Sequence, residues 1–470
     1  MEHKSFQIET SLLQLISPEQ AYSYQIIPIS CNTTSITFKT TSKNTLTLKQ
    51  ELQIVLGKEV LLVSETEENL RQYLAKNYRK SNAIISESLH YSEDFLLKII
   101  LEAKNIGSSD IHFEIFEHTS RVRFRIDGKL IEKYVIPITE YAIIVNRIKI
   151  MAGMDISEKR LPQDGRISID TEVSDFDIRV SALPTLFGEK IVLRLLSKDT
   201  SSIQLEALGF TKEELKTYRE SIKKPNGIIL ISGPTGSGKT TTLYATLKEI
   251  NNDNTNILTI EDPIEYTLEG INQVQLKENI GLNFASTLRT FLRQDPDIIM
   301  VGEIRDVETA NMAIRAALTG HLVLSTIHTN SAWATITRLI DMGIPSFLVA
   351  STLNISVAQR LVRKLCNHCK KAAKISIDLF PKNSSLPTNL KNHYVSVGCE
   401  KCYYTGYSGR KAIYEIIPIN KHLTNQIKSN VLDIEAYLLK EKIPTLKSNA
   451  LELIQQGETS IEEVYTLLTE

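Results

Sequence analysis

One stretch of this 470-residue chain decides its fold: Gly227-Ile-Ile-Leu-Ile-Ser-Gly-Pro-Thr-Gly-Ser-Gly-Lys-Thr-Thr-Thr242. Ile228 to Ile231 form a short apolar run rich in β-branched side chains, which predicts a buried strand. The segment from Gly233 to Thr240 then matches G-x-x-x-x-G-K-[ST] at every position, and Thr241 to Ile250 predicts a helix. Strand, glycine-rich loop and helix thus follow each other in the order that a phosphate-binding loop requires.

The residues of this loop suit phosphate chemistry. Gly233, Gly236 and Gly238 let the backbone turn its N–H groups toward phosphate oxygens, and the helix N-terminus adds partial positive charge. Lys239 can reach the β- and γ-phosphates, and the hydroxyl of Thr240 can bind Mg²⁺. A glycine turn that binds nothing is the alternative, and the complete match in its strand–loop–helix context disfavours it. The predicted nucleotide-binding residues are Gly233, Pro234, Thr235, Gly236, Ser237, Gly238, Lys239, Thr240 and Thr241.

The composition is that of a soluble globular protein, with 42% hydrophobic and 23% charged residues. The formal net charge of −1 provides no basic field for nucleic acid, so we expect no nucleic-acid partner. No apolar run approaches the ~18 residues of a membrane span, and the N-terminus lacks a basic-then-apolar signal peptide. We therefore expect a cytoplasmic protein, which a partner recruits to any membrane on which it acts.

The length and the changes of pattern along the chain predict several domains. Helix and strand patterns alternate through most of the chain, whereas its last part has helical periodicity. The predicted parts are a short docking module (1–80), an α+β lobe (85–198), a linker (199–208), an α/β core around the phosphate-binding loop (209–365), a cysteine-containing subdomain (366–410) and a helical C-terminal subdomain (411–470).

Three carboxylates follow the apolar strand predicted from Asn256 to Ile260: Glu261, Asp262 and Glu265. Carboxylates at a strand end beside a phosphate-binding loop are suited to hold the water ligands of Mg²⁺ or a reacting water. We therefore predict all three residues as catalytic.

Two more strands of the core end in a glutamate and a histidine. Glu303 comes one glycine after the buried run Ile298–Val301, a Walker-B-like position from which it can orient or deprotonate the attacking water. A solvated carboxylate at the strand end is the alternative for Glu303. His328 ends the strand of Gly320–Asn330, and we predict it as a sensor of the γ-phosphate, with a structural histidine as the alternative.

Two groups of arginines are candidate donors to phosphate, because guanidinium is planar, always charged and bidentate. Those of the lobe would reach a nucleotide bound elsewhere, on a neighbouring subunit for example, and a solvated basic face is the alternative. Two arginines of the core lie four positions apart on one helix face, where they either bind phosphate or stabilise an interface. The candidates are Arg160, Arg166, Arg179 and Arg194 in the lobe, and Arg289 and Arg293 in the core.

Four of the five cysteines fall in two C-x-x-C pairs, Cys366 with Cys369 and Cys399 with Cys402. In a cytosolic protein two such pairs predict a tetrahedral zinc site with four thiolate ligands rather than disulfides. The spacer is longer than the usual ~15–20 residues, but loop length costs little entropy. Because thiolates fill every ligand position, the zinc would be structural. Cys31 stands alone and predicts an ordinary buried thiol.

Taken together, these motifs resemble the type II secretion and type IV pilus assembly ATPases, a branch of the additional-strand RecA-like motor ATPases. The resemblance covers about residues 85–470, and the tetracysteine resembles the metal-binding subdomain of the assembly and secretion branch. The segments that carry it are Arg160-Leu-Pro-Gln-Asp-Gly-Arg166, Leu183-Pro-Thr-Leu-Phe-Gly-Glu-Lys190, the Walker A segment Gly233–Thr240, the Asp box Thr259-Ile-Glu-Asp-Pro-Ile-Glu265, the Walker B segment Arg293-Gln-Asp-Pro-Asp-Ile-Ile-Met-Val-Gly-Glu-Ile-Arg-Asp306 and the His box Gly320–Asn330.

The resemblance implies a RecA-like core and a preceding α+β, PAS-like lobe that together bind and hydrolyse ATP with Mg²⁺. It implies a homo-hexameric ring, peripheral on the inner face of the cytoplasmic membrane, with each nucleotide between one core and the lobe arginines. Such a motor would act on an inner-membrane platform protein and meet a cytoplasmic docking protein, in pilus or pseudopilus assembly or in type II secretion. Two features depart from the family pattern. The short N-terminal region leaves the docking partner open, and Trp333, where the family more often has a small residue, predicts a change in local packing.

Two other classes of protein use similar motifs. A RecA-like nucleic-acid translocase is the alternative, and the near-zero charge and the lack of a basic–aromatic stripe disfavour it. DNA-stimulated ATPase activity would favour it. A non-motor regulatory or scaffold nucleotide binder is the third possibility, and the complete set of Walker A, Walker B and His box disfavours it.

Overall fold

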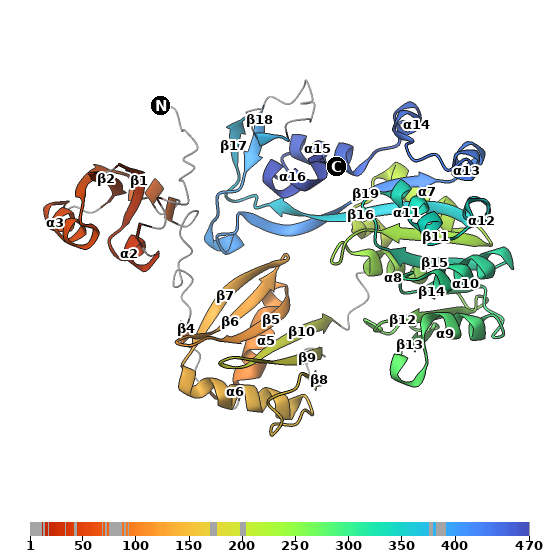
Figure 1. The fold of residues 1–470 in the computed structure, drawn as a ribbon, viewed down its shortest axis with the longest axis horizontal. Coiled ribbons are helices and arrows are strands. Elements are labelled where there is room, and N and C mark those ends of the chain that lie inside the picture. Colours follow the sequence, from red (N-terminus) through yellow and green to blue (C-terminus); the bar gives the residue numbers. More distant parts are fainter. Residues whose placement is uncertain are drawn as a thin grey trace. The chain divides into compact units, whose positions relative to one another are not determined.

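The computed structural model describes most of the chain, which divides into two compact units (Figure 1). The first unit contains the N-terminal module, the lobe and the two cysteine segments, and the second contains the core and the C-terminal helices. Across the part of the chain that the structure describes, no helix combines the length and the apolar character that a membrane span needs. The described residues are 12, 15–16, 18–32, 34–41, 45–67, 69–70, 73–74, 87–88, 91–92, 94–169, 176–197, 204–375, 379–381 and 392–469.

A three-stranded sheet forms the N-terminal module. Strand β1 (Ile26–Cys31) pairs antiparallel with β2 (Ser35–Thr40), and β3 (Glu59–Ser64) pairs parallel with β2 after helix α3 (Thr45–Leu56). Side chains of β2 alternate between buried and part-buried, as the period of two along a strand dictates. The short helix α2 (Pro18–Ser23) precedes the sheet.

The prediction that Cys31 is buried is wrong. Burial along β1 decreases toward its end, and the thiol of Cys31 is exposed. The Nζ of Lys58 lies 3.6 Å from its sulfur. A lone cysteine in an apolar strand indicates burial only where the strand itself stays covered.

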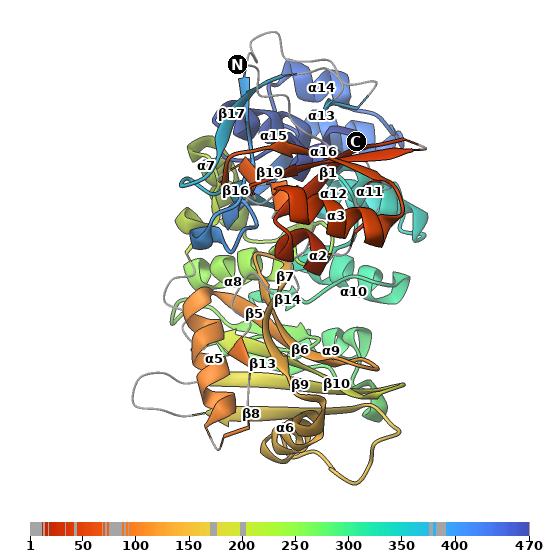
Figure 2. The same cartoon turned by 90° about the vertical axis from the view of Figure 1, so that its left-hand side faces the viewer.

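The lobe is a seven-stranded sheet with two helices on one face (Figure 2). The strand order is β4-β7-β6-β5-β10-β9-β8. Apolar side chains of α5 (Phe95–Ile106) and α6 (Ile138–Met151) share one core with inward residues of the sheet such as Ile111 and Phe113. The strands are β4 (Glu87–Ser88), β5 (Ser108–Ile115), β6 (Ser120–Ile126), β7 (Lys129–Ile136), β8 (Gln163–Ile169), β9 (Phe176–Thr185) and β10 (Gly188–Ser197).

The other face of the lobe sheet carries buried charged residues. Asp110, His112 and Glu114 alternate along β5 with the apolar residues of the core and are all less than a tenth exposed. Burial by itself raises the pKa of Glu114, but hydrogen bonds, led by those from Arg123 and Lys190, lower it to about 2. Burial, with the nearby positive charges, lowers the pKa of His112 to about 4. Neither ring nitrogen of His112 has a hydrogen-bond partner among the described residues.

The core of the second unit is a seven-stranded sheet in the order β13-β12-β14-β15-β11-β16-β19. Strand β11 (Gly227–Ser232) lies between β15 and β16 and pairs parallel with both. Helices α7 and α8 pack on one face of the sheet and α9 to α11 on the other. The remaining elements are β12 (Ile257–Glu261), β13 (Asn272–Gln275), β14 (Ile298–Val301), β15 (Leu322–Ile327), β16 (Leu353–Leu365), α7 (Lys212–Ile222), α8 (Lys239–Ile250), α9 (Phe284–Phe291), α10 (Val307–Leu318), α11 (Ala332–Asp341) and α12 (Ser346–Thr352).

The C-terminal part is not helical throughout. Strand β19 (Tyr407–Pro418) continues past residue 411, where we predicted a helical subdomain, and forms the edge of the core sheet beside β16. Residues Ala412–Ile417 are all buried, including the charged Glu415. In so short a buried segment, hydrophobic periodicity does not distinguish a strand from a helix. Helices follow it: α13 (Lys421–Lys428), α14 (Glu435–Lys440), α15 (Leu446–Gln455) and α16 (Ile461–Thr469).

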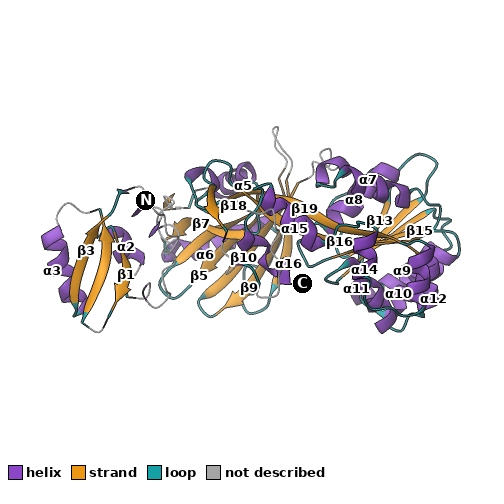
Figure 3. Ribbon diagram, turned by 90° about the horizontal axis from the view of Figure 1, so that it is seen from above, coloured by secondary structure: helices purple, strands orange, loops and turns teal. Residues whose placement is uncertain are grey.

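The predicted fold class, a mixed α/β protein with C-terminal helices, is confirmed (Figure 3). Trp333 has an identifiable role in it. The side chain is 6% exposed in the core, and its Nε1 donates to the carbonyl of Val431 at 3.1 Å. Trp333 thereby ties α11 to the segment between α13 and α14, which accounts for a large residue at this position.

Candidate functional site

The predicted site residues of the core gather at one edge of its sheet. In the register, Ser232 at the end of β11 lies opposite Ile327 of β15, and Val301 at the end of β14 lies opposite Ser325. Gly233, Glu303 and His328 therefore follow the carboxyl ends of three adjacent parallel strands. Ligands of open α/β sheets bind at this edge.

The phosphate-binding loop lies tightly against β16. Gly233 has a φ of +147°, and a Cβ at this position would lie 2.4 Å from the carbonyl oxygen of Gln359. Gly238 has a φ of +88°, and a Cβ there would lie 2.8 Å from Nε2 of Gln359. Both glycines are therefore needed for close approach as well as for their backbone conformation.

Lys239 folds back over the loop at the start of α8. Its Nζ donates to the carbonyls of Gly233 at 2.8 Å and Pro234 at 3.1 Å. Burial lowers the pKa of Lys239, and the nearby carboxylate of Glu303 opposes that change. The buried hydroxyl of Ser237 has no hydrogen-bond partner among the described residues. An unpaired hydroxyl, an ammonium and a helix N-terminus on one loop fit a phosphate group.

Glu303 lies between Arg305 and His328. The guanidinium of Arg305 forms an ion pair with one oxygen of Glu303, and Nε2 of His328 lies 3.2 Å from the other. A second nitrogen of Arg305 lies 3.8 Å from a carboxylate oxygen of Asp262. The structure thus brings together Glu303, His328 and Asp262, with Arg305 linking the two carboxylates.

The three carboxylates at the end of β12 do not form a single cluster. Glu261 is 3% exposed, and its carboxylate accepts hydrogen bonds from Tyr244, from Thr259 at 2.6 Å and from Gln273 at 3.0 Å. Asp262, the next residue, is exposed and faces Arg305. Glu261 is the last residue of β12, whereas Asp262 lies in the bend that follows the strand, and the chain turns between the two carboxylates.

Glu265 is half-buried, and its backbone N–H donates to the hydroxyl of Tyr244 at 3.2 Å. Tyr244 therefore joins Glu261 to the segment that carries Glu265. We infer that Glu261 positions the segment of Glu265 through Tyr244 and does not itself contact a reacting water.

The lobe arginines have partners within the lobe. Arg160 pairs with Glu158 at 3.2 Å, Arg166 with Asp177, and Arg194 donates to Asp110 at 2.9 Å. The arginine side chains of these pairs are 88%, 68% and 59% exposed, respectively. Exposed ion pairs contribute little free energy, so these guanidinium groups can exchange partners.

Arg166 and Arg179 lie directly opposite each other in the antiparallel pair of β8 and β9. Like charges in such positions destabilise a sheet. Arg166 is paired with Asp177 on the same strand as Arg179, which offsets part of this repulsion.

A buried ion pair supports the loop that carries Arg160. Lys149, at the end of α6, is fully buried, and its Nζ lies 2.7 Å from Glu189 at the start of β10. The same Nζ donates to the carbonyl of Glu158 at 2.8 Å. Lys149 thus fixes helix, hairpin and arginine loop relative to one another.

The two core arginines do not meet the phosphate-binding loop in the contacts that the structure gives them. Arg289, on α9, pairs with Glu308 at 3.1 Å, and Arg293 donates to the carbonyl of Arg289 at 3.2 Å. Both contacts join α9 to neighbouring backbone or to α10. Their predicted roles at a phosphate or at an interface stay predictions.

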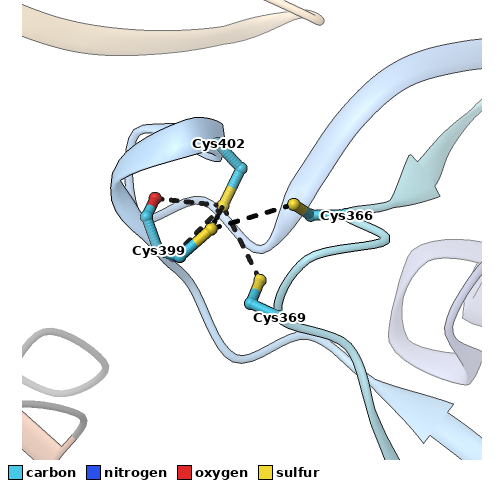
Figure 4. Close-up of side chains that lie close together, drawn as sticks. All are labelled: Cys366, Cys369, Cys399 and Cys402. Atoms are coloured by element: carbon cyan, nitrogen blue, oxygen red, sulfur yellow. Dashed lines mark hydrogen bonds between the residues drawn. The ribbon is translucent and has the colours of Figure 1, made fainter.

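The four predicted zinc ligands converge on one point (Figure 4). The sulfur–sulfur distances are 3.9 Å for Cys366 and Cys399, 3.8 Å for Cys369 and Cys402, and 3.7 Å for Cys399 and Cys402. A tetrahedron with Zn–S bonds of about 2.3 Å has edges of about 3.8 Å. These three distances match the edges of such a tetrahedron, and all four sulfurs lie within 4.8 Å of one another.

Backbone N–H groups support the same sulfurs. The N–H groups of Gly398 and Gly406 lie 3.3 Å from the sulfurs of Cys369 and Cys402, respectively. Such donors stabilise thiolates and orient metal ligands. The donor set and its surroundings fit a zinc ion.

Sequence reasoning missed three residues that the structure places beside the predicted site residues. Arg305 stands two positions after Glu303 in the Walker B segment, so its place in the motif was the available signal. Gln359 and Arg360, on β16, contact the phosphate-binding loop and the segment after His328. Nothing in their local sequence marks them, because only the strand order places β16 next to β11.

The fold and the site define the class of RecA-like nucleotide-binding proteins with a phosphate-binding loop. The chain belongs to the family described as type II/IV secretion system protein, whose model matches residues 86–466. Among the described residues, no helix is long and apolar enough to cross a membrane, and the thiols of four cysteines converge.

Several known proteins are similar to this chain. The type IV pilus assembly ATPase PilB of Myxococcus xanthus is 39% identical over 98% of this chain and 87% of its own length. The type II secretion system ATPase E of Vibrio cholerae is 45% identical over 82% of this chain and 79% of its own. Among solved structures, the pilus retraction motor PilT with bound ADP has a TM-score of 0.55 and 27% identity, over 79% of this chain and 96% of that one. The predicted family is confirmed, and a secretion or pilus motor ATPase is the function that these relatives support.

Proposed function

We propose that this chain is a cytoplasmic motor that hydrolyses ATP to ADP and phosphate and thereby drives type IV pilus or pseudopilus assembly or type II secretion. The observation that carries the proposal is the position of Glu303, which follows a strand adjacent to β15 and meets His328 at 3.2 Å. The relatives are ATPases of both systems by name, which supports a shared reaction.

Each group of the site has a role in this reaction. The loop N–H groups, Ser237 and Lys239 bind the phosphates, and Lys239 leaves its two backbone carbonyls to do so. Glu303 orients or deprotonates the attacking water, and His328 holds the carboxylate on its other oxygen. Mg²⁺, bound through Thr240, would neutralise charge on the phosphates.

The carboxylates of the Asp box and the arginine of Walker B complete the arrangement. Asp262 and Glu265 would hold water ligands of the metal. The hydrogen bonds of Tyr244 to Glu261 and to the backbone of Glu265 support a role for Glu261 in fixing their segment. In this proposal Arg305 stays ion-paired with the carboxylate of Glu303 until nucleotide binds. Its guanidinium then pairs with Asp262 or with phosphate, which releases the base for water.

We infer a homo-hexameric ring in which lobe arginines complete the site of a neighbouring subunit. Arg166 and Arg179 are the strongest candidates because they stand opposite each other. Arg160 and Arg194 are the other two, and Arg289 and Arg293 lie on a helix of the core. An arginine supplied in this way accelerates phosphoryl transfer by ~10³–10⁵-fold in other NTPases.

The ring would work with two partner proteins and a structural metal ion. An inner-membrane platform protein and a cytoplasmic docking protein would hold it at the inner face of the membrane. Four thiolates spaced for a tetrahedron support a structural zinc ion, which would contribute on the order of 10 kcal/mol to the folding of its subdomain.

The test is the ATPase rate as a function of protein concentration, with the molar mass measured by light scattering in ATP and Mg²⁺. We expect activity to rise as the protein assembles into a species near six subunits. Arg166→Ala should abolish most of that activity without preventing ATP binding. The control is Arg147→Ala, which replaces an exposed arginine of α6 and should leave the activity unchanged. A monomer that hydrolyses ATP at the full rate at every concentration would show that one chain contains the whole site.

A further inference from the structure

Two consecutive residues of β16, Gln359 and Arg360, connect the phosphate-binding loop to the segment of His328. We propose that Gln359 positions the loop and α8 for nucleotide binding, and that Arg360 positions the segment after His328 for hydrolysis. Both are positioning residues, and the inference rests on the proposed ATP site. The strand would then set the distance between the group that binds phosphate and the group that senses it.

The register of the sheet places the two residues beside the site. Ser232, the last residue of β11, lies opposite Ala358 of β16. Gln359 is therefore the neighbour of Gly233, the first residue of the loop. On its other side β11 pairs with β15, where Ile327 precedes His328. The loop thus lies between the His328 strand and the strand of Gln359.

Alternation along β16 directs its side chains to two faces of the sheet. Ile355 and Val357 belong to the apolar cluster that includes α8. Ala358 and Val362 belong to the cluster that includes α11. Gln359 continues the first set and Arg360 the second. One residue therefore faces the helix of the phosphate-binding loop, and the next faces the segment that leads into α11.

Gln359 contacts the loop and its helix at three points. It is 2% exposed, and its Oε1 accepts a hydrogen bond from Oγ1 of Thr242 at 2.9 Å. Its backbone carbonyl and its Nε2 are the atoms that a Cβ on Gly233 or on Gly238 would strike. Gln359 therefore packs directly against both Gly233 and Gly238 of the loop.

Arg360 contacts the segment after His328. It is 8% exposed, and its guanidinium donates to the carbonyl of Asn330 at 2.6 Å and to the carbonyl of Gln359 at 3.3 Å. One residue, Thr329, separates Asn330 from His328, whose ring meets Glu303. The same positive charge lies close enough to Lys239 to contribute to lowering its pKa, after burial. Arg360 therefore holds backbone on one side of the site and adds positive potential at the loop.

The two roles predict opposite kinetic signatures. Gln359→Leu removes the acceptor of Thr242 and the amide beside Gly238, whereas Thr242 keeps its contact to the carbonyl of Gly238 at 3.3 Å. We expect the Kd for ATP, measured by calorimetry in the Glu303→Gln background, to rise about fivefold, the effect of one net hydrogen bond. Arg360→Ala should lower kcat by about 10- to 100-fold, as expected for hydrogen bonds from a charged donor, and change that Kd less than about threefold.

Conservative and remote substitutions provide the controls. Arg360→Lys keeps the charge and one donor to Asn330, so its kcat should recover to within about fivefold of the wild-type value. Arg363→Ala removes another arginine of the same strand, whose partner is Glu463 on α16 at 3.0 Å. Its Kd and kcat should stay within about twofold of wild type, even where its melting temperature falls.

Two outcomes would overturn the inference. One is a parallel change of Kd and kcat in Gln359→Leu and in Arg360→Ala, with the same loss of melting temperature as in Arg363→Ala. Such a result would indicate a general structural effect, which does not separate ATP binding from turnover. The other is wild-type Kd in Gln359→Leu or wild-type kcat in Arg360→Ala. If Gln359→Leu does not fold, Gln359→Glu keeps an acceptor for Thr242 and places a carboxylate beside the loop; an unchanged Kd there would refute the role equally.

Failure of the proposed ATPase function would give a different experimental result from failure of the positioning roles. Wild-type protein without ATP hydrolysis would remove the kcat readout and the motor proposal together. The Kd for ATP would still be measurable, and a Gln359→Leu variant with wild-type affinity would then refute the positioning role of Gln359 independently.

Discussion

Replacing Lys149 with Met should destabilise the lobe while leaving the core intact. Lys149 is fully buried between Glu189 at 2.7 Å and the carbonyl of Glu158 at 2.8 Å. Methionine fills a similar volume but leaves the carboxylate of Glu189, itself 7% exposed, without its partner. Breaking a buried pair in this way costs about 3–5 kcal/mol. Protection against hydrogen exchange in the lobe should then fall by roughly 10²–10⁴-fold.

The assay compares the two units of the same protein. Hydrogen exchange of peptides from α6 and β10 reports the lobe, and fluorescence of Trp333, the sole tryptophan, reports the core. We expect loss of protection in the lobe peptides and an unchanged denaturation midpoint by Trp333 fluorescence. Lys129→Met, at an exposed lysine of β7, is the matched control and should change neither.

The double variant Lys149→Met with Glu189→Leu separates charge from packing. Removing both charges should restore most of the lost protection, because replacing a buried pair by apolar residues is often neutral. Protection that stays at the wild-type level in the single variant would refute the reasoning. So would a double variant as unstable as the single one, since the cost would then lie in packing rather than in an unpaired carboxylate.

Three further predictions concern the site, the thiols and pH. Glu303→Gln should retain ATP binding and lower kcat by at least about 10²-fold in a steady-state ATPase assay, and a wild-type kcat would exclude Glu303 as the base. In zinc-loaded protein, Ellman's reagent should titrate one thiol, the exposed Cys31, and all five after chelation and unfolding; five reactive thiols before chelation would contradict the zinc site. The lobe should lose up to about 2 kcal/mol between pH 6.5 and pH 5, because His112, with a pKa lowered to about 4 by burial, binds its proton more readily when unfolded. His112→Asn should flatten this dependence in denaturation monitored by hydrogen exchange, and an equal slope in both proteins would refute it.

The elements that the sequence predicted best are those whose signal is local. The segment Gly227–Ile250 contains its strand, its loop glycines and its helix within one continuous run, so each residue constrains its neighbours directly. The two C-x-x-C pairs likewise carry most of their geometry in their own spacing. Strand ends followed by polar residues placed Glu303 and His328 at the same edge, because parallel strands share the direction of their carboxyl ends.

The sequence could not separate residues whose environments depend on distant elements. Glu261 and Asp262 are adjacent, yet Tyr244 and Gln273 surround the first with hydrogen bonds, whereas Arg305 faces the second. Cys31 is exposed although it pairs with Ile36 of β2, so its burial depends on whether another element covers this end of the sheet. In each case the deciding partner comes from another element, and local patterns carry no information about it.

The sequence alone thus predicted the phosphate-binding loop, the four convergent thiols and the family, because each depends on residue types at fixed short spacings; the family and the convergence of the thiols are confirmed. Only the tertiary structure decided that β19 forms an edge of the core sheet, that Lys149 supports the Arg160 loop, and that Gln359 and Arg360 lie beside the candidate site. These features arise from strand order and register, which form between segments far apart in the chain. Hydrophobic periodicity specifies that a strand is buried, but several pairings bury it equally well, and the packed structure selects among them.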